Sequence, residues 1–435
     1  MNKPIPTPPP QIGLRALGAM LREGHPLAAM QIFHDELGDI FRPQLPGFKP
    51  VVMAGPEAAH FVLVEARDEL RWRIETDPVT RLLRHGVLVE DGESHDQLRR
   101  MMSPALHKRM LATYQLEMLA ATNQVTASWP ASGEVDMLVE MRKIALLILN
   151  QTLFRVDFSP EMHRLWKAVL GVIRYISPGL WMLWKEAPRS QYRGYIQQMD
   201  GYLHRIIQLR KQQLESNPIE ANDMLSVLIL AGLDDELVRD QLLTMLIAGH
   251  DTSTALLAWA LYLLGAHPEA LHQVQAEVEQ GLGDQPPAQE HLANFNYLDQ
   301  VIQEALRLYP PIHLGSRRAA RDLEYQGYRI PAGERVIYSI YLTQRHKAHW
   351  EEPHRFKPER YSSGSRKSSY TWLAFGGGPR NCIGAAFGQL EARLVLARVL
   401  QCFKLELVEK HVRLHMGATL EPHPGVRMRV QRTRL

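Results

Sequence analysis

The chain of 435 residues has little cysteine, with only Cys382 and Cys402. Two cysteines cannot build a disulfide framework, and they exclude any zinc or iron–sulfur site that needs four thiolates. A strong excess of one charge is also absent, because 50 lysine and arginine residues stand against 47 aspartate and glutamate residues. This balance argues against a dedicated nucleic-acid-binding protein. With 45% hydrophobic residues, the composition is that of a globular chain with a large core.

Signals for export or membrane insertion are missing as well. Residues 1–12 are rich in proline and lack the apolar segment of a secretory signal. The longest nearly uncharged stretch, residues 252–270, contains Gly265 and Pro268, whereas a membrane span needs ~20 predominantly apolar residues. We therefore expect a cytoplasmic protein without a transmembrane anchor, whose residues 1–12 form a proline-rich extended arm.

Secondary-structure signals change along the chain, but no repeat or Gly/Ser-rich linker marks a domain boundary. Strand-like runs occur at residues 51–54, helical signals dominate from about residue 90 to 310, and turn residues with short strands follow, at 325–333 and 335–338. The length alone allows about three domains. The expected class is mostly α with minor β at both ends.

One long helix is predicted from Asp234 or Asp235 towards His267. Its middle, residues 248–253, reads Ala-Gly-His-Asp-Thr-Ser and places small and polar residues inside an apolar helix. Glycine costs ~1 kcal/mol there relative to alanine. The pattern allows two interpretations: a polar stripe facing solvent, or a gap that sets an acid and an alcohol beside a ligand.

The second unusual segment, residues 371–385, contains three consecutive glycines and then Cys382 just before a helix predicted over 384–402. Glycines allow a tight backbone path beside a flat cofactor. Backbone N–H groups at the helix start, including that of Gly384, favour a thiolate at Cys382. Arg380 suits an anionic group, and Phe375 is placed to cover the sulfur. A catalytic nucleophile and a buried thiol are the alternatives for such a cysteine.

The pattern Phe375-x-x-Gly378-x-Arg380-x-Cys382-x-Gly384 resembles the haem-binding signature of the cytochrome P450 family. From this chain's composition, a chance match to its Phe, Gly and Cys positions is expected about 2 times in 10,000. Other motifs of that family follow in the correct order: His95-x-x-x-Arg99, Ala248-Gly249-x-Asp251-Thr252-Ser253, Glu304-x-x-Arg307, Arg317-x-Ala319-x-x-Asp322 and Phe356–Tyr361, which includes Arg360.

The resemblance implies the cytochrome P450 fold, a single triangular helix-rich domain with small β-sheets that spans residues 1–435. It also implies haem b, with Cys382 as the iron ligand. Asp251 and Thr252 then pass protons to dioxygen. The cofactor-binding set that follows is His95, Arg99, Ala248, Gly249, Arg317, Phe375, Gly376, Arg380, Cys382 and Gly384.

Glu304, Arg307 and Arg360 are implied to form a buried structural ion network, in which loss of one partner costs ~3–5 kcal/mol. Two positions depart from the commonest pattern of the family, because His95 replaces a tryptophan and Tyr361 replaces a phenylalanine. Neither departure contradicts haem binding. We expect Cys402 to be a buried apolar residue.

The resemblance also places a substrate pocket, and its lining here is almost entirely apolar. We therefore expect a hydrophobic small molecule, such as a fatty acid, terpenoid or steroid. Residues 176–184, with two tryptophans, are either core packing or a mobile lid with weak membrane contact. The expected pocket residues are Leu83, Val87, Leu88, Ile173, Ile176, Met245, Leu246, Ile312, Leu314 and Leu420.

The leading functional hypothesis is a haem-thiolate monooxygenase that inserts one atom of dioxygen into its substrate. The alternatives are a haem-thiolate peroxygenase or isomerase and a non-catalytic haem or lipid carrier, both disfavoured by the acid–alcohol pair. We expect a monomer that receives electrons from a separate ferredoxin or flavodoxin with its NAD(P)H reductase. The docking face is expected to include Arg99, Arg100, Lys108, Arg109 and Arg380.

Overall fold

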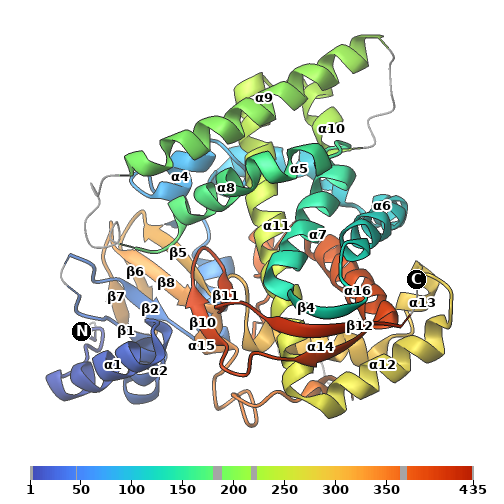
Figure 1. Cartoon of the computed structure of the whole chain (residues 1–435). Coiled ribbons are helices and arrows are strands. Elements are labelled where there is room, and N and C mark those ends of the chain that lie inside the picture. The colour runs from blue at the N-terminus through green and yellow to red at the C-terminus, as the bar shows by residue number, and fades with distance from the viewer. Residues whose placement is uncertain (1–2, 46, 180–188, 217–222, 363–369, 434–435) are drawn as a thin grey trace.

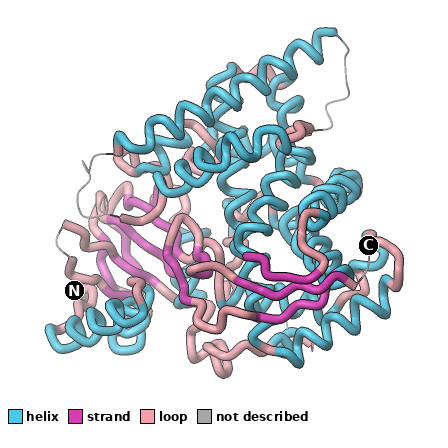
Figure 2. Tube along the Cα trace, in the orientation of Figure 1, coloured by secondary structure: helices cyan, strands magenta, loops and turns pink. Residues whose placement is uncertain are grey.

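The computed structural model describes residues 3–45, 47–179, 189–216, 223–362 and 370–433. Helices fill most of the molecule, and strands gather in the corner that holds the N-terminus and beneath the helices on the side of the C-terminus (Figures 1 and 2). The helices are α1 (Pro10–Glu23), α2 (Leu27–Leu37), α3 (Pro56–His60), α4 (Pro78–Leu83), α5 (Gly92–Met102), α6 (Lys108–Ala127), α7 (Met137–Leu153), α8 (Ser159–Ile176), α9 (Arg193–Ser216), α10 (Met224–Leu230), α11 (Asp235–Ala266), α12 (Pro268–Leu282), α13 (Gln289–Leu292), α14 (Asn296–Leu308), α15 (Ile340–Thr343) and α16 (Ala385–Cys402).

The described strands form four small sheets. The largest has the order β1-β2-β8-β5-β3, in which β2 runs parallel to β8 with Val51 opposite Val336 and the other neighbours are antiparallel. A three-stranded sheet has the order β4-β12-β9, and β6–β7 and β10–β11 are hairpins. The strands are β1 (Ile40–Phe41), β2 (Val51–Met53), β3 (Leu70–Arg71), β4 (Ser132–Asp136), β5 (Leu314–Ala319), β6 (Leu323–Tyr325), β7 (Tyr328–Ile330), β8 (Arg335–Ser339), β9 (Phe403–Leu407), β10 (Arg413–Met416), β11 (Leu420–His423) and β12 (Arg427–Arg432).

Helix α11 passes through the centre of the molecule (Figure 1) and organises the helical core. The Asp234 side chain caps its first turn by accepting from the Leu237 N–H over 2.8 Å, and Pro268 begins the next helix directly after its end. Its 32 residues correspond to about 48 Å. The predicted bounds of this helix are confirmed, and so are the predicted class, mostly α with minor β, and the final helix.

The N-terminal arm is shorter than predicted. Residues 3–9 are extended, with the Lys3 N–H donating to the Gly327 carbonyl over 2.8 Å, but α1 already begins at Pro10. Proline is well suited to the first turn of a helix, because its missing N–H has no partner to lose there. The prediction of an extended arm over residues 1–12 is therefore wrong from Pro10 onwards.

Two further findings concern the strands and the membrane. The predicted strand and turn at 325–333 is a hairpin that reverses at Gln326 and Gly327, both with positive φ. None of the described helices combines the length and the apolar character that a bilayer crossing requires.

Candidate active site

The cysteine loop precedes α16 and is closed by its own backbone. The Cys382 N–H donates to the Phe375 carbonyl over 2.8 Å, and the Gly376 N–H donates to the Leu373 carbonyl over the same distance. Gly376 and Gly378 have φ of 70° and 63°, in the left-handed region that favours glycine. The glycines thus fold the loop back on itself, so that Phe375 and Cys382 lie side by side at its base.

The sulfur of Cys382 lies where the protein exerts opposing effects on its charge. The residue keeps an exposed surface although protein surrounds its sulfur, and it forms no disulfide. The surrounding protein raises the pKa of the thiol by desolvation, while the Gly384 N–H and the Arg99 guanidinium favour the thiolate. Arg99 is tied to the same loop, because its two Nη atoms donate to the carbonyl and to the side-chain oxygen of Asn381 over 2.8 and 2.7 Å.

Four basic side chains from α5, β5 and the cysteine loop lie near one another, and one of them, Arg99, acts on Cys382. Burial and the charges of Arg380 and Arg99 lower the pKa of His95, against a 2.8 Å hydrogen bond with Asp96 that raises it. Burial also lowers the pKa of Arg380 to about 10, and the nearby charge of Arg317 acts in the same direction. The structure therefore brings together the four bases expected at the cofactor.

Arg317 is the one arginine among these bases that is buried. Its side chain is buried, and it donates to the Ser316 carbonyl over 2.8 Å. Its guanidinium carbon lies 5.4 Å from the ring centroids of both Trp72 and Tyr338. Within the described part of the chain, no carboxylate lies at ion-pair distance from Arg317. A buried cation of this kind calls for an anionic partner.

The middle of α11 presents a small accessible face. From residue 241 to 261, only Ala248, Gly249 and Thr252 are half-buried, and all the others are buried. The Thr252 hydroxyl donates to the Ala248 carbonyl over 2.6 Å, the helix-weakening bond expected of a mid-helix threonine. Gly249 serves packing, because a Cβ atom there would lie 2.6 Å from Leu149 on α7. The polar segment thus opens one face of the otherwise buried middle of α11.

Asp251 is enclosed by partners that sequence reasoning missed. It is 1% exposed and lies 3.3 Å from Arg142 on α7 and 2.9 Å from the Thr419 hydroxyl. Burial and the negative charge of Glu421 raise its pKa to about 7, whereas Arg142 opposes this shift. No local signal singled out Arg142, because it stands between Glu140 and Lys143 in a charged part of α7. An acid with this pKa both gives and takes protons near neutral pH.

A second missed contact joins α11 to α16. The Ser253 hydroxyl donates to Glu391 over 2.5 Å, and both side chains are buried. Burial raises the pKa of Glu391 to about 8, against the hydrogen bond from Ser253 that lowers it. This contact ties the acid–alcohol segment to the helix that follows the cysteine loop. No local pattern around Glu391 indicated it.

Glu304, Arg307 and Arg360 meet in a buried ion network. Arg307 donates to both carboxylate oxygens of Glu304 over 2.7 and 2.8 Å, and Arg360 donates to one of them over 3.1 Å. The backbone N–H of Lys357 adds a fourth bond over 3.0 Å. Arg307 also donates to carbonyls of residues 344 and 353. The network therefore fixes α14 to the segment that carries Arg360.

The predicted pocket residues are only partly gathered. Leu314 packs instead with a separate cluster around Phe41 and Val52, because it lies on the sheet rather than among the helices. Leu88 and Ile312 keep 36% and 43% of their surface exposed. Leu420 is fully buried, and its N–H donates to the Pro311 carbonyl over 3.0 Å. The residues that share the large helical core are Leu83, Val87, Ile173, Ile176, Met245 and Leu246.

Two other expectations meet the edges of the described structure. Residues 180–184 of the expected lid and the side chain of Lys108 lie outside the described part. Arg100 and Arg109 are exposed, and Arg100 pairs with Glu93 over 2.7 Å. Cys402 is buried, as expected.

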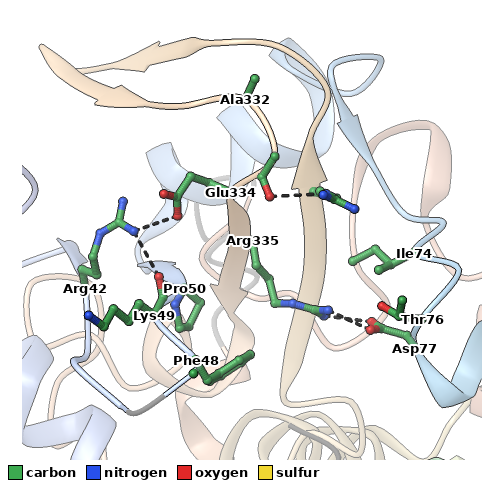
Figure 3. Close-up of a pocket in the computed structure, with 13 residues that line it drawn as sticks. Arg42, Phe48, Lys49, Pro50, Ile74, Thr76, Asp77, Ala332, Glu334 and Arg335 are labelled. Carbon is green, nitrogen blue, oxygen red and sulfur yellow. Dashed lines mark hydrogen bonds and ion pairs between the residues drawn. The ribbon is translucent and has the colours of Figure 1, made fainter. Parts of the chain in front are cut away.

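A surface cleft of about 720 Å³ lies in the β-rich corner (Figure 3). Two of its arginines are paired, Arg42 with Glu334 over 2.7 Å and Arg335 with Asp77 over 2.7 Å. None of the site residues expected from the sequence lines this cleft. The chemistry described above therefore belongs elsewhere, to the cysteine loop and α11.

The residues at the cysteine loop fit the haem implied by the sequence. The buried Arg317, with Arg99, Arg380 and His95, matches the need of a propionate-bearing cofactor for cations. The side chain of Cys382 supplies a soft ligand suited to iron. The accessible face of α11 consists of small residues and one alcohol. This donor set fits haem better than it fits a metal ion held by protein ligands alone.

Comparison with known proteins agrees with this fit. The family model for Cytochrome P450 matches residues 6–425. Cyclooctatin synthase from Streptomyces melanosporofaciens is 30% identical over 406 residues, which cover 89% of this chain and 86% of that protein. Cyclooctat-9-en-7-ol 5-monooxygenase from the same organism is 29% identical, with 85% and 83% covered. A putative cytochrome P450 137 from Mycobacterium tuberculosis is also 29% identical, with 97% and 86% covered.

The fold comparison points the same way. The solved structure of retinoic acid-bound cyanobacterial CYP120A1 matches with a TM-score of 0.86 at 24% identity, covering 99% of this chain and 100% of that one. The chain therefore belongs to the cytochrome P450 family, and it is a cytochrome P450 monooxygenase that uses haem and dioxygen.

Proposed function

We propose that this enzyme oxidises a terpenoid-type hydrophobic molecule by inserting one atom of dioxygen, with haem b held through Cys382. When bound, the haem supplies the iron at which dioxygen is activated. The observation that carries the proposal is the Cys382 side chain, at the base of a glycine loop beside Gly384 and Arg99. The terpenoid class is favoured over fatty acids and steroids by the names of relatives, which include cyclooctat-9-en-7-ol 5-monooxygenase.

Each remaining residue has a role in this proposal. His95, Arg99, Arg317 and Arg380 pair with the propionates of the cofactor. Ala248 leaves room beside it, whereas Gly249 lets α11 pack closely against α7. Phe375, Gly376 and Gly384 shape the loop that presents the sulfur. Asp251 moves protons from the interior of α11, and Thr252 offers its hydroxyl at the accessible face.

The supporting network and the partners are also part of the proposal. Glu304, Arg307 and Arg360 hold the fold around the cysteine loop. Electrons come from a separate ferredoxin or flavodoxin and its NAD(P)H reductase, which dock near Arg99 and Arg109. The expectations of a single domain over residues 1–435, a monomer and a cytoplasmic location stay predictions.

An optical experiment tests the cofactor assignment. The reduced protein under carbon monoxide is expected to give the red-shifted Soret band of thiolate-ligated haem, and Cys382→Ala is expected to lose it. Cys402→Ala is the matched control and keeps the band. A band that persists in Cys382→Ala, or a protein that takes up no haem during expression with ample haem, would refute the assignment.

A binding panel tests the substrate class. Terpenoids, fatty acids and steroids are added to the oxidised enzyme, and low-to-high-spin spectral shifts are recorded. Terpenoids are expected to give the tightest shifts. A clear preference for one of the other two classes refutes the terpenoid assignment while leaving the haem-thiolate assignment intact.

Turnover with peroxide alone, and none with dioxygen and electrons, would instead favour a peroxygenase.

A further inference from the structure

The carboxylate of Asp251 is held by two elements other than its own helix. Arg142 Nη1 on α7 lies 3.3 Å from Oδ1, and the Thr419 hydroxyl donates to Oδ2 over 2.9 Å. Arg142 and Thr419 are themselves 5% and 3% exposed. Both oxygens of the acid therefore have a protein partner in a buried setting, and neither partner belongs to the family motif on α11.

Thr419 belongs to the turn that precedes β11, and Glu421, two residues later, joins the same group of side chains around Asp251. Glu421 accepts a hydrogen bond from Nη2 of Arg142, so one guanidinium bridges two carboxylates. The Glu421 side chain is 19% exposed, whereas that of Asp251 is 1% exposed. Successive side chains of an extended segment alternate in direction, which places Thr419 and Glu421 on the same side.

The turn is also fixed through its backbone. The indole N–H of Trp259 on α11 donates to the Leu420 carbonyl over 2.9 Å, and the Leu420 N–H donates to the Pro311 carbonyl over 3.0 Å. Trp259 lies two turns after Asp251 on the same helix. The turn is therefore docked onto the helix that carries the acid, at two points about two helical turns apart.

We propose that residues 419–421, together with Arg142, position the acid Asp251 and set its charge, with Thr419 fixing its orientation and Glu421 balancing Arg142. This inference rests on the proposed function only for the use of the acid. The contacts themselves are independent of the cofactor.

The charges around Asp251 allow the role of Glu421 to be distinguished from that of Thr419. Burial and Glu421 raise the pKa of Asp251, and Arg142 and the Thr419 hydrogen bond lower it. His250, next to it on α11, is fully buried, and burial together with the charge of Arg142 lowers its pKa, so it contributes no charge at neutral pH. On the α16 side, Glu391 is held by Ser253. Removing the negative charge of Glu421 therefore lowers the pKa of the acid, whereas removing the Thr419 hydroxyl frees its orientation and raises it.

The test uses two variants of nearly unchanged shape. In Glu421→Gln, the pH midpoint of the Asp251 carboxyl is expected to fall by about one pH unit. In Thr419→Val, the yield of product per electron pair is expected to fall roughly 3- to 10-fold, the equivalent of one hydrogen bond. Infrared difference titration of the resting protein follows the carboxyl directly, and its band is assigned by its loss in Asp251→Asn.

Matched controls keep the outcome clear. Glu406→Gln makes the same change in an exposed pair with Arg429, and Thr122→Val removes a buried hydroxyl that bonds only within α6. Both are expected to leave the carboxyl midpoint and the coupling as in the parent enzyme. If Glu421→Gln and Thr419→Val behave like these controls, the positioning role is refuted. Failure of the parent protein to show the thiolate-haem band would refute the proposed function instead, and the infrared titration would still judge the positioning role.

Discussion

Replacing Glu304 by glutamine is the sharpest test of how α14 is held to the segment that carries Arg360. The Glu304 carboxylate accepts two bonds from Arg307, one from Arg360 and one from the Lys357 N–H. The side chains of all three ion-network residues are at most 5% exposed. Glutamine keeps the volume, but it removes the only negative charge in this trio and turns an NH₂ donor towards a guanidinium.

The expected loss of unfolding free energy in Glu304→Gln depends on the burial of the charges rather than on the number of hydrogen bonds. Leaving buried guanidinium groups without their counter-charge costs ~3–5 kcal/mol. This is a large part of the ~5–15 kcal/mol that stabilises a typical protein. At ~2.1 cal/mol/K per residue, the unfolding entropy of a chain of this length is ~0.9 kcal/mol/K, so the melting temperature is expected to fall by ~3–5 °C.

The assay compares this change with an exposed pair of the same spacing. Arg355 and Glu352 are also three residues apart, at 3.0 Å, but their side chains are 69% and 44% exposed. Glu352→Gln is therefore expected to cost much less stability than Glu304→Gln, because solvent screens the exposed pair. Urea unfolding followed by tryptophan fluorescence measures both variants, and haem retention is recorded beside it. If Glu304→Gln loses no more stability than Glu352→Gln, the buried network does not stabilise the fold more than an exposed ion pair does.

Two further predictions concern a surface cluster and the cysteine loop. Burial alone would raise the pKa of Asp39, but hydrogen bonds from two histidines hold it below its usual range, and the bond with Asp39 raises the pKa of His346. The resulting stabilisation is present from about pH 4 to about pH 6.5, because it fades as acid protonates Asp39 and as base deprotonates His346. Asp39→Asn should therefore lower the melting temperature most in that window. An equal loss of melting temperature from about pH 3 to pH 9 would contradict this linkage between protonation and stability. Gly378→Ala places a Cβ atom 2.6 Å from the Leu63 carbonyl oxygen at a φ of 63°. It should therefore lower the free energy of unfolding by roughly 1–3 kcal/mol and reduce the haem content. The control Gly388→Ala, in open space on α16, should change neither quantity.

The parts of the site that could be predicted from the sequence are those whose residues lie within a few positions of one another in the chain. The loop from Phe375 to Gly384 has its glycines, arginine and cysteine at fixed spacing, so the local chain geometry is contained in the pattern. Glu304 and Arg307 lie three residues apart on one predicted helix, and they meet in the structure as this spacing requires. The bounds of α11 followed from its acidic start and from Pro268.

The parts that could not be predicted depend on contacts between distant segments. Asp251 is 109 residues from Arg142 and 168 residues from Thr419, and no local pattern marks either as its partner. Leu314 alternates within β5, but only the sheet order decides which core its side chain joins. Pairings of this kind follow from tertiary packing, which a single sequence does not display.

The tight fit of Gly249 against Leu149 gives the middle of α11 two unequal sides. On the side of α7, a residue larger than Gly249 must displace the Leu149 side chain, so substitution there disturbs the contact between the two helices. Ala248 and Thr252 lie at the accessible face, where a change of size alters the space in front of the helix and leaves its packing behind intact. Libraries that aim to reshape substrate preference in this enzyme are therefore best built at Ala248, with Gly249 kept constant and Thr252 spared for its hydroxyl.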